Sequence, residues 1–172
     1  AVASGGYTVG DGVQLFSTAH PQVAGPVISN RPTVAVDFNE TSLEAAIIQI
    51  AAWTDDRGKL INARVRKALF APANQFVATR ILETQLQPGT ANNDVNAIRV
   101  MASVPEGFAV NHFLTDPDAW FLMTDVPNGF NYFNRRSVRE DSDGDFTTGN
   151  IRYRQSERYS FGVSDYLCSW AS

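Results

Sequence analysis

The chain has 172 residues, of which 44% are hydrophobic and 11% aromatic, enough to fill the core of one domain or of one domain with an appendage. This composition argues against an intrinsically disordered chain. With 14 Lys and Arg against 18 Asp and Glu, the net charge is −4, which disfavours a general nucleic-acid binder and a protein that binds membrane surfaces.

A single cysteine and the lack of long apolar runs further restrict the class of protein to which the chain can belong. Cys168 has no partner for an internal disulfide, so packing must hold the fold, and we expect this residue to act as a small apolar side chain. No run of about 18 apolar residues could span a bilayer. The chain begins with Ala1, and its opening lacks the features of a signal peptide. We therefore expect that processing or truncation removed a preceding segment.

The first part of the chain is predicted to be irregular. Residues 1–12 are rich in glycine and small residues, whose ordering costs much backbone entropy. Residues 18–31 contain two prolines and only Val27-Ile28 as an apolar anchor, which is typical of an extended loop.

The clearest predicted helix begins at Thr41, where Thr41-Ser42-Leu43-Glu44 matches a capping box. Gly58 is the expected C-cap, and the helix should end before Asp55 and Asp56, whose charges oppose its dipole. The apolar face of this helix consists of Leu43, Ala46, Ile47, Ile50 and Ala51.

A short strand and a second helix are predicted next. The strand covers Lys67–Ala71 and ends at Pro72, which also suits the first turn of the following helix. That helix covers residues 73–86 and is closed by Pro88-Gly89. Its apolar positions are Ala73, Phe76, Val77 and Ile81.

Residues 92–124 are predicted to form the centre of the fold. Alternating apolar residues indicate a strand over residues 97–104 with one buried face. A turn follows at residues 115–118, where Pro117 supplies the backbone angle of the second turn position. Trp120–Met123 is then a buried strand. The buried face of the first strand would consist of Ile98, Val100, Ala102 and Val104.

The last part of the chain predicts a hairpin after the turn at Pro127-Asn128-Gly129. Its strands are Phe130–Arg139 and Ile151–Leu167, joined by the polar loop Glu140–Asn150. Apolar residues alternate with Arg and Asn along both strands, which predicts a thin sheet with one wet face.

Three alternating carboxylates in the hairpin loop, Asp141, Asp143 and Asp145, resemble the start of a calcium loop. The match fails because Gly144 and Arg152 stand at positions 4 and 12, where an EF-hand needs its glycine at position 6 and a glutamate at position 12. We interpret the segment as a solvated loop. A calcium- or carbohydrate-binding β-rich module stays open as an alternative.

The two histidines are expected to have structural roles. His20 and His112 have no metal-ligand spacing with each other or with Cys168, and no nucleophile elbow, P-loop or dinucleotide fingerprint is present. His112 with Asp116 and Asp118 leaves a small hydrolase as a further alternative. Otherwise the sequence predicts a non-enzyme without catalytic, metal-binding or cofactor-binding residues.

Basic charge is concentrated in the last quarter of the chain. One interpretation places these arginines on exposed positions of neighbouring strands, paired with Glu140, Glu157 and the Asp loop. The other makes them an intersubunit salt-bridge surface, since the planar guanidinium can hold a carboxylate with two hydrogen bonds. The predicted intersubunit contacts are Arg135, Arg136, Arg139, Arg152 and Arg154.

The order of these elements resembles the major capsid proteins of tailed bacteriophages, especially the Mu-like major head subunit group. The resemblance extends from Asp11 to Tyr166. The matching pieces are DGVQLFSTAHP (11–21), the capped helix at Ser42, Gly58-Lys59, ALFAPANQFVATRIL (68–82), NNDVNAIRV (92–100), LTDPDAWFL (114–122) and RYSFGVSDY (158–166).

This resemblance implies an α+β fold with the axial domain of a tailed-phage major capsid protein plus the C-terminal strands of its peripheral domain. Residues 1–18 would be an extended segment, 19–126 the axial domain and 127–172 the returning strands of the peripheral domain. The family's N-terminal arm, extended loop and spine helix do not precede Asp11.

The resemblance also implies a function. The chain would be a structural subunit of an icosahedral phage head, self-assembling into pentamers and hexamers around packaged double-stranded DNA without binding it specifically. Its partners would be its own copies and scaffold, decoration or portal proteins, with no membrane and no cofactor. It would reside in the virion after assembly in the bacterial host cytoplasm. Some members crosslink Lys to Asn, a role not assigned to Lys59 or Lys67.

Overall fold

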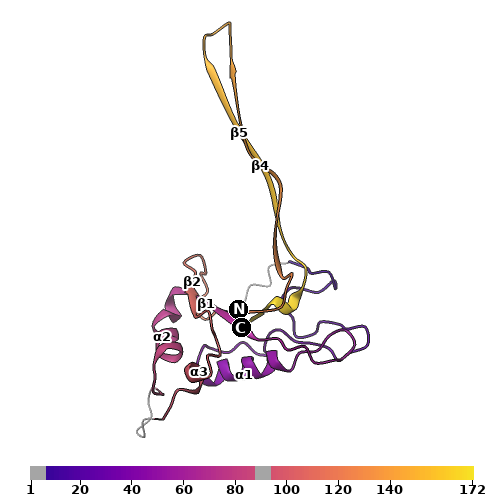
Figure 1. Ribbon diagram of the computed structural model, residues 1–172, viewed down its shortest axis with the longest axis vertical. Coiled ribbons are helices and arrows are strands. Elements are labelled where there is room, and N and C mark those ends of the chain that lie inside the picture. Colours follow the sequence, from indigo (N-terminus) through magenta and orange to yellow (C-terminus); the bar gives the residue numbers. More distant parts are fainter. Residues whose placement is uncertain (1–6, 88–93) are drawn as a thin grey trace.

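The computed structural model describes residues 7–87 and 94–172. It consists of a mixed body from which one long hairpin projects, with helix α1 on the side of the body away from the hairpin (Figure 1). Helices and strands both occur, so the predicted α+β class is confirmed. In chain order the elements are α1 (Glu40–Ala51), β1 (Val65–Phe70), the 3₁₀ helix η1 (Pro72–Asn74), α2 (Gln75–Glu83), α3 (Ala97–Val100), β2 (Phe108–Val110), β3 (Trp120–Thr124), β4 (Phe130–Gly144), β5 (Ile151–Val163), the 3₁₀ helix η2 (Tyr166–Cys168) and β6 (Ser169–Ala171).

The body is built on a four-stranded mixed sheet in the order β2-β1-β3-β6. Strand β1 runs parallel to β2 and antiparallel to β3, and β6 adds antiparallel to β3 with Leu122 opposite Trp170. The strand predicted at Trp120–Met123 is present as β3, with Trp120, Leu122 and Thr124 buried and the two residues between them half-buried. The centre of the predicted fold is therefore correct at this strand.

Aromatic rings fill the core between the sheet and α1. The Trp120 ring lies 4.7 Å from that of Trp170, and the Phe38 ring lies 4.4 Å from that of Phe70, measured between ring centroids. Such pairs contribute about 0.5–1.5 kcal/mol beyond the burial of their area. Helix α1 contributes Leu43, Ala46 and Ile50, all buried.

Helix α1 begins earlier than predicted, because its cap is Asn39 and not Thr41. The Asn39 side chain accepts a hydrogen bond from the Ser42 amide at 2.8 Å, which satisfies a free N–H of the first turn. The helix ends at Ala51, before the two aspartates, as predicted. Gly58 does not cap it, since its positive φ of 77° belongs to a separate turn.

Strand β1 and the proline that ends it follow the prediction, but the next helix is shorter. Pro72 opens η1, and α2 covers only Gln75–Glu83. Ala78 and Ile81 are buried, whereas Phe76 is 73% exposed. The predicted end of this helix at residues 88–89 lies outside the described residues.

The predicted strand at residues 97–104 is wrong: residues 97–100 form the short helix α3. The Asn96 side chain accepts from the Arg99 amide at 3.3 Å and caps the helix, while its own amide group donates to the Ile81 carbonyl at 2.7 Å. Val100, expected inside, is 67% exposed. The cap and the contact with α2 outweigh the alternating pattern. The turn predicted at residues 115–118 is present, and the Asp116 carboxylate closes it.

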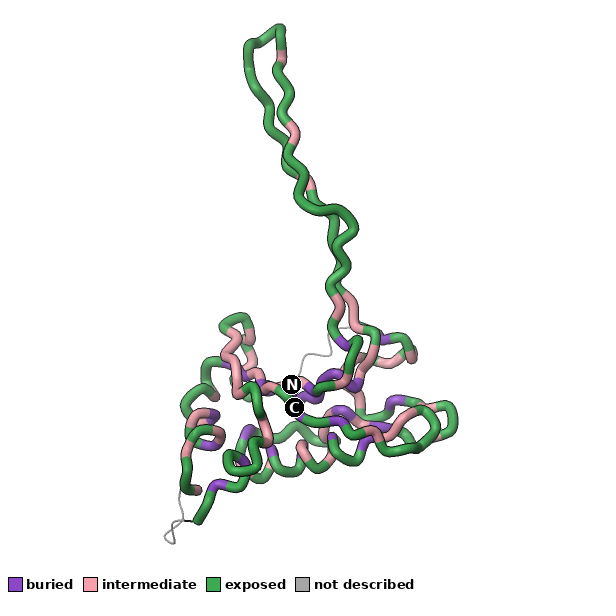
Figure 2. The backbone as a smooth tube through the Cα atoms, in the orientation of Figure 1, coloured by how far each residue is buried: buried purple, intermediate pink, exposed green. Residues whose placement is uncertain are grey.

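Strands β4 and β5 form a separate two-stranded antiparallel sheet, paired from Phe130 opposite Val163 to Gly144 opposite Ile151. The predicted hairpin is confirmed, with a first strand longer and a second strand shorter than expected. The prediction of one dry face is wrong, because nearly every residue of the ribbon is exposed (Figure 2). The ribbon stands away from the body, so along most of its length neither face is covered by another layer of the described residues.

Strand β6 returns the chain to the body after the hairpin. Its pairing with β3 places residues 169–171 in the body sheet, although the sequence grouped them with the hairpin strands. The boundaries at residues 18 and 126 stay a prediction. No helix in the described part of the chain is long and apolar enough to cross a membrane.

Candidate assembly surface and buried polar cluster

The hairpin is anchored to the body by a tight turn at its base. Asn128 adopts a positive φ of 62° there, and the Ser164 amide donates to the Gly129 carbonyl at 3.0 Å. The Asn131 side chain donates to the Ser164 hydroxyl at 2.8 Å. Both strands thus leave and re-enter the body at one fixed point, from which the rest of the ribbon extends (Figure 1).

An aromatic cluster covers one part of the ribbon near this base. Tyr132, Tyr159 and Phe161 pack across the two strands with ring centroids 5.3–5.8 Å apart. Cross-strand aromatic pairs of this kind stabilise a two-stranded ribbon. The three side chains are nevertheless 57%, 51% and 70% exposed, so the cluster leaves an aromatic surface uncovered.

The five arginines predicted as intersubunit contacts all lie on the hairpin and are exposed. Arg139 and Arg154 share Asp141, at 3.0 and 3.4 Å between nitrogen and carboxylate oxygen, and Arg152 lies 3.7 Å from Asp145. These exposed pairs contribute little to stability. Of the five, Arg135 and Arg136 have no ion pair within the described residues 7–87 and 94–172.

The three alternating aspartates do not converge on a metal site. The Thr148 hydroxyl and the Thr147 amide donate to Asp145, and these hydrogen bonds hold the pKa of its carboxyl below the ordinary value. Asp141 forms ion pairs with two arginines of the hairpin, and Asp143 lies opposite Arg152 in the pairing of β4 with β5. Among the described residues, no group of three His, Cys, Asp or Glu side chains is placed to hold a metal ion.

The segment considered for a hydrolase has a local structural role. The Asp116 carboxylate accepts from the Asp118 amide at 3.1 Å and so closes the turn before β3. His112 is exposed, on the loop that follows β2. This geometry favours turn formation over proton transfer.

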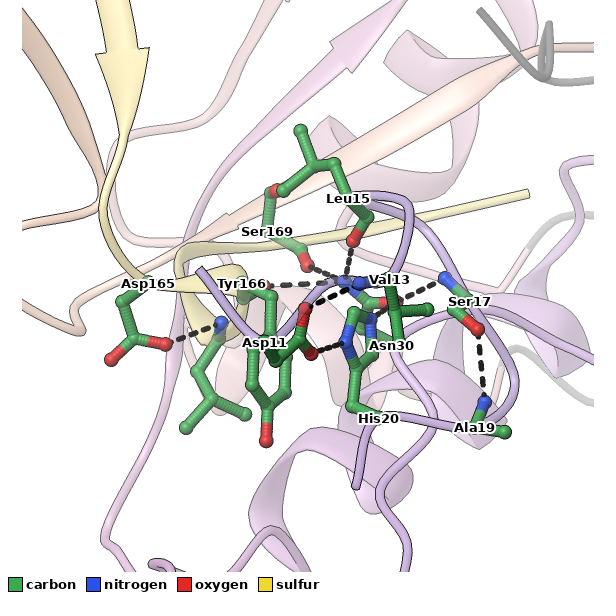
Figure 3. Close-up of polar contacts among 11 residues, drawn as sticks. Asp11, Val13, Leu15, Ser17, Ala19, His20, Asn30, Asp165, Tyr166 and Ser169 are labelled. Carbon is green, nitrogen blue, oxygen red and sulfur yellow. Dashed lines mark hydrogen bonds and ion pairs between the residues drawn. The ribbon is translucent and has the colours of Figure 1, made fainter. Parts of the chain in front are cut away.

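A buried polar cluster that the sequence did not predict lies beneath the hairpin base (Figure 3). His20 is fully buried, with Nδ1 2.6 Å from Asp11 Oδ2 and Nε2 3.2 Å from Asn30 Oδ1. Its ring stacks on that of Tyr166 at 3.9 Å between centroids and 3° between planes. This burial agrees with the structural role predicted for His20, but the sequence gave no sign of its partners.

Beside this cluster lies a cleft of about 610 Å³ between the hairpin base and the loops of the body. Its walls include five aspartates. Asp55 accepts from the Lys59 and Arg57 amides, and the first of these hydrogen bonds contributes most to lowering the pKa of its carboxyl. The other four are Asp11, Asp56, Asp125 and Asp165.

Most of these carboxylates already accept a hydrogen bond from a backbone amide of the body. Asp11 accepts from the Val13 amide, Asp125 from the Arg64 amide and Asp165 from the Leu167 amide, at 2.8–2.9 Å. The cleft is therefore an acidic surface formed by capped turns.

No protein-family model matches the chain, and no curated protein matches it. The solved structures that are similar to it include the following two. One is a virus-like particle from Pyrococcus furiosus, with 10% sequence identity and a TM-score of 0.45 over 88% of this chain and 56% of the other. The second is a phage-related protein from Bordetella bronchiseptica RB50, with 14% identity and a TM-score of 0.48 over 91% of this chain and 56% of the other. The chain thus spans little more than half the length of each.

Proposed function

We propose that this chain is a structural subunit of an icosahedral phage head, which self-assembles through pentamers and hexamers into the shell around packaged double-stranded DNA. In this function its partners are its own copies, with scaffold, decoration or portal proteins, and the enclosed DNA is not bound specifically. Its location is the virion, after assembly in the cytoplasm of the bacterial host.

The projecting hairpin is the observation that carries this proposal. A two-stranded ribbon alone in water is only marginally stable. This one is exposed along nearly its whole length (Figure 2), and its exposed residues include large apolar side chains. Such a surface is typical of a segment that another molecule covers. The exposed large side chains of its strands are Phe130, Tyr132, Phe133, Val138, Ile151, Tyr153, Tyr159 and Phe161.

The charges of the hairpin suit a contact with a second copy. Arg135 and Arg136 lack intrachain ion pairs in the described parts of the chain, and the body of each copy carries the acidic cleft. Opposite charges on two surfaces favour and orient their association. We infer that these two arginines reach carboxylates of a neighbouring subunit. Arg139, Arg152 and Arg154 then join the same interface while sharing their present partners.

The position of the resembling motifs in the fold also supports the proposal. Residues 68–82 form β1, η1 and α2, and residues 114–122 form the turn and the start of β3, so these motifs build the body. On this basis we assign residues 19–126 to the axial domain, and β4 and β5 to the peripheral domain.

The proposal is tested in the particles themselves. Phage-like particles are purified from induced cells of the host by density-gradient centrifugation, and their proteins are quantified by mass spectrometry. A shell subunit should be the most abundant protein of DNA-filled particles. Its absence from every particle fraction would reject the function, whatever the behaviour of the isolated chain.

A further inference from the structure

The hydrogen bonds of Asn30 fix which side of its amide faces His20. Its Nδ2 lies 2.6 Å from the Leu15 carbonyl oxygen and close to two more, and its Oδ1 accepts from the Ser17 amide at 2.8 Å. The opposite orientation would place oxygen against three carbonyls and nitrogen against an N–H. Asn30 therefore presents an acceptor to His20 (Figure 3). The two further carbonyls belong to Tyr166 and Ser169, at 3.2 and 3.3 Å.

Both ring nitrogens of His20 thus face acceptors. Nε2 faces Asn30 Oδ1, and Nδ1 faces Asp11 Oδ2 at 2.6 Å, while the other oxygen of Asp11 accepts from the Val13 amide. A neutral imidazole has one donor and one acceptor nitrogen, so it cannot satisfy both contacts beside a carboxylate. The proton between Nδ1 and Oδ2 can be counted on either atom. In each case the pair holds one proton more than a neutral imidazole and a carboxylate.

The surroundings of the ring favour this extra positive charge. Asp11 is the carboxylate in contact, and its side chain is only 14% exposed. Tyr166 covers the ring, and burial foremost raises the pKa of its phenol, so that it stays neutral. The charges of Asp165, from the segment before η2, and Asp56, from the turn after α1, also raise the pKa of the Tyr166 phenol that covers the ring. In the described chain, no Lys or Arg forms an ion pair with Asp11.

We propose that His20 is held as an imidazolium. Its two N–H groups then bind Asp11 and Asn30 and so fasten the N-terminal segment to the chain that follows the hairpin, an arrangement that we call the clasp. The clasp reaches that chain through Asn30, which donates to the carbonyls of Tyr166 and Ser169 directly after β5. Nδ1–H would go on donating to Asp11, so the proton would leave Nε2, and two lone pairs would then face each other at the buried 3.2 Å contact with Asn30 Oδ1. An unmade hydrogen bond of this kind is costly because no water replaces it. The base of the hairpin therefore weakens when the proton leaves.

Nitrogen-15 NMR of the folded chain with labelled histidine tests the proposal directly. At pH 7.5 both ring nitrogens of His20 should have the chemical shifts of protonated nitrogen or of a proton shared with Asp11. His112, which is exposed, is the reference within the same spectrum. A His20 ring with one fully unprotonated nitrogen in the folded protein at pH 7.5 would overturn the proposal.

A matched pair of variants gives a second readout. In Asp11→Asn the new amide can donate to Nδ1 while its oxygen still accepts from the Val13 amide, so a neutral ring fits. We expect the His20 ring of this variant to be neutral in the nitrogen-15 spectrum at pH 7.5, with one protonated and one unprotonated nitrogen. His112→Gln should leave the His20 chemical shifts as they are in the unchanged chain. A His20 ring with both nitrogens protonated in Asp11→Asn would refute the clasp, and if that variant does not fold, the measurement on the unchanged chain decides.

Discussion

Gly129 lies directly against Cys168 at the base of the hairpin: a Cβ added at Gly129 would stand 2.0 Å from the Cys168 Cβ. Only glycine fits at this position, because any side chain would overlap Cys168. Its carbonyl also accepts from the Ser164 amide, so the contact seats both strands of the hairpin on the body.

Gly129→Ala should accordingly destabilise the protein. The added methyl group must displace the buried Cys168 or the turn, and such overpacking costs about 1–3 kcal/mol. Gly144→Ala is the matched control, because nothing lies within 4 Å of a Cβ at that glycine. The free energies of unfolding in urea check this prediction. Equal values for the two variants would contradict the packing described at the hairpin base.

The thiol of Cys168 should be unreactive in the folded protein. Burial raises the pKa of this thiol, so that little thiolate forms at pH 8, and the side chain is covered. Alkylation by iodoacetamide, followed by mass spectrometry, should be slow in buffer and fast in denaturing urea. Rapid alkylation under native conditions would show that the hairpin base opens.

The cap of α1 distinguishes two neighbouring residues. Asn39→Ala removes the acceptor of the Ser42 amide and should lower the free energy of unfolding by about 0.5–2 kcal/mol. Thr41→Ala, at the residue that the sequence predicted as the cap, should have a smaller effect. Urea unfolding of the two variants checks this. A larger loss of unfolding free energy in Thr41→Ala than in Asn39→Ala would mean that Thr41 caps the helix.

Part of the fold follows from local sequence and part does not. The strand at Trp120 is predictable from its apolar run and the hairpin from its alternation and turn residues, because these signals act over a few positions. Helix α3 was missed, since its stability depends on Asn96, which both caps it and bonds to the Ile81 carbonyl. Alternation at the hairpin likewise predicts strands but does not say whether a second layer covers them.

The buried polar cluster was missed for a related reason. Its residues come from separate parts of the chain, and Asn30 bonds to a carbonyl 136 residues away. The signal available was His20 itself, within a segment that also carries Asp11. Single residues at such spacing match no motif of metal binding or catalysis, and only the folded chain brings them together.

Calcium should leave the melting temperature unchanged. Asp145 accepts from Thr147 and Thr148, and Asp141 is shared by two arginines, so the loop has no open set of carboxylates. Thermal unfolding with and without millimolar calcium chloride checks this. A calcium-dependent rise, which a binding site would produce by linkage, would favour the alternative of a calcium-binding module.

The hairpin arginines should govern association between copies. Arg135→Glu with Arg136→Glu reverses the charge that we assign to the subunit interface, so assemblies should be lost or weakened while the chain stays folded. The matched control is the same double reversal at Arg80 and Arg99, two exposed arginines of the body. Equal assembly by both double variants, compared by light scattering, would remove the hairpin arginines from the interface.

Self-assembly is the central claim, and sedimentation velocity with negative-stain images of each peak measures it most directly. It is performed on the 172-residue chain across the concentrations at which the protein stays in solution. The account predicts rings of five or six subunits, sheets or closed shells. Monomers at every concentration would contradict it.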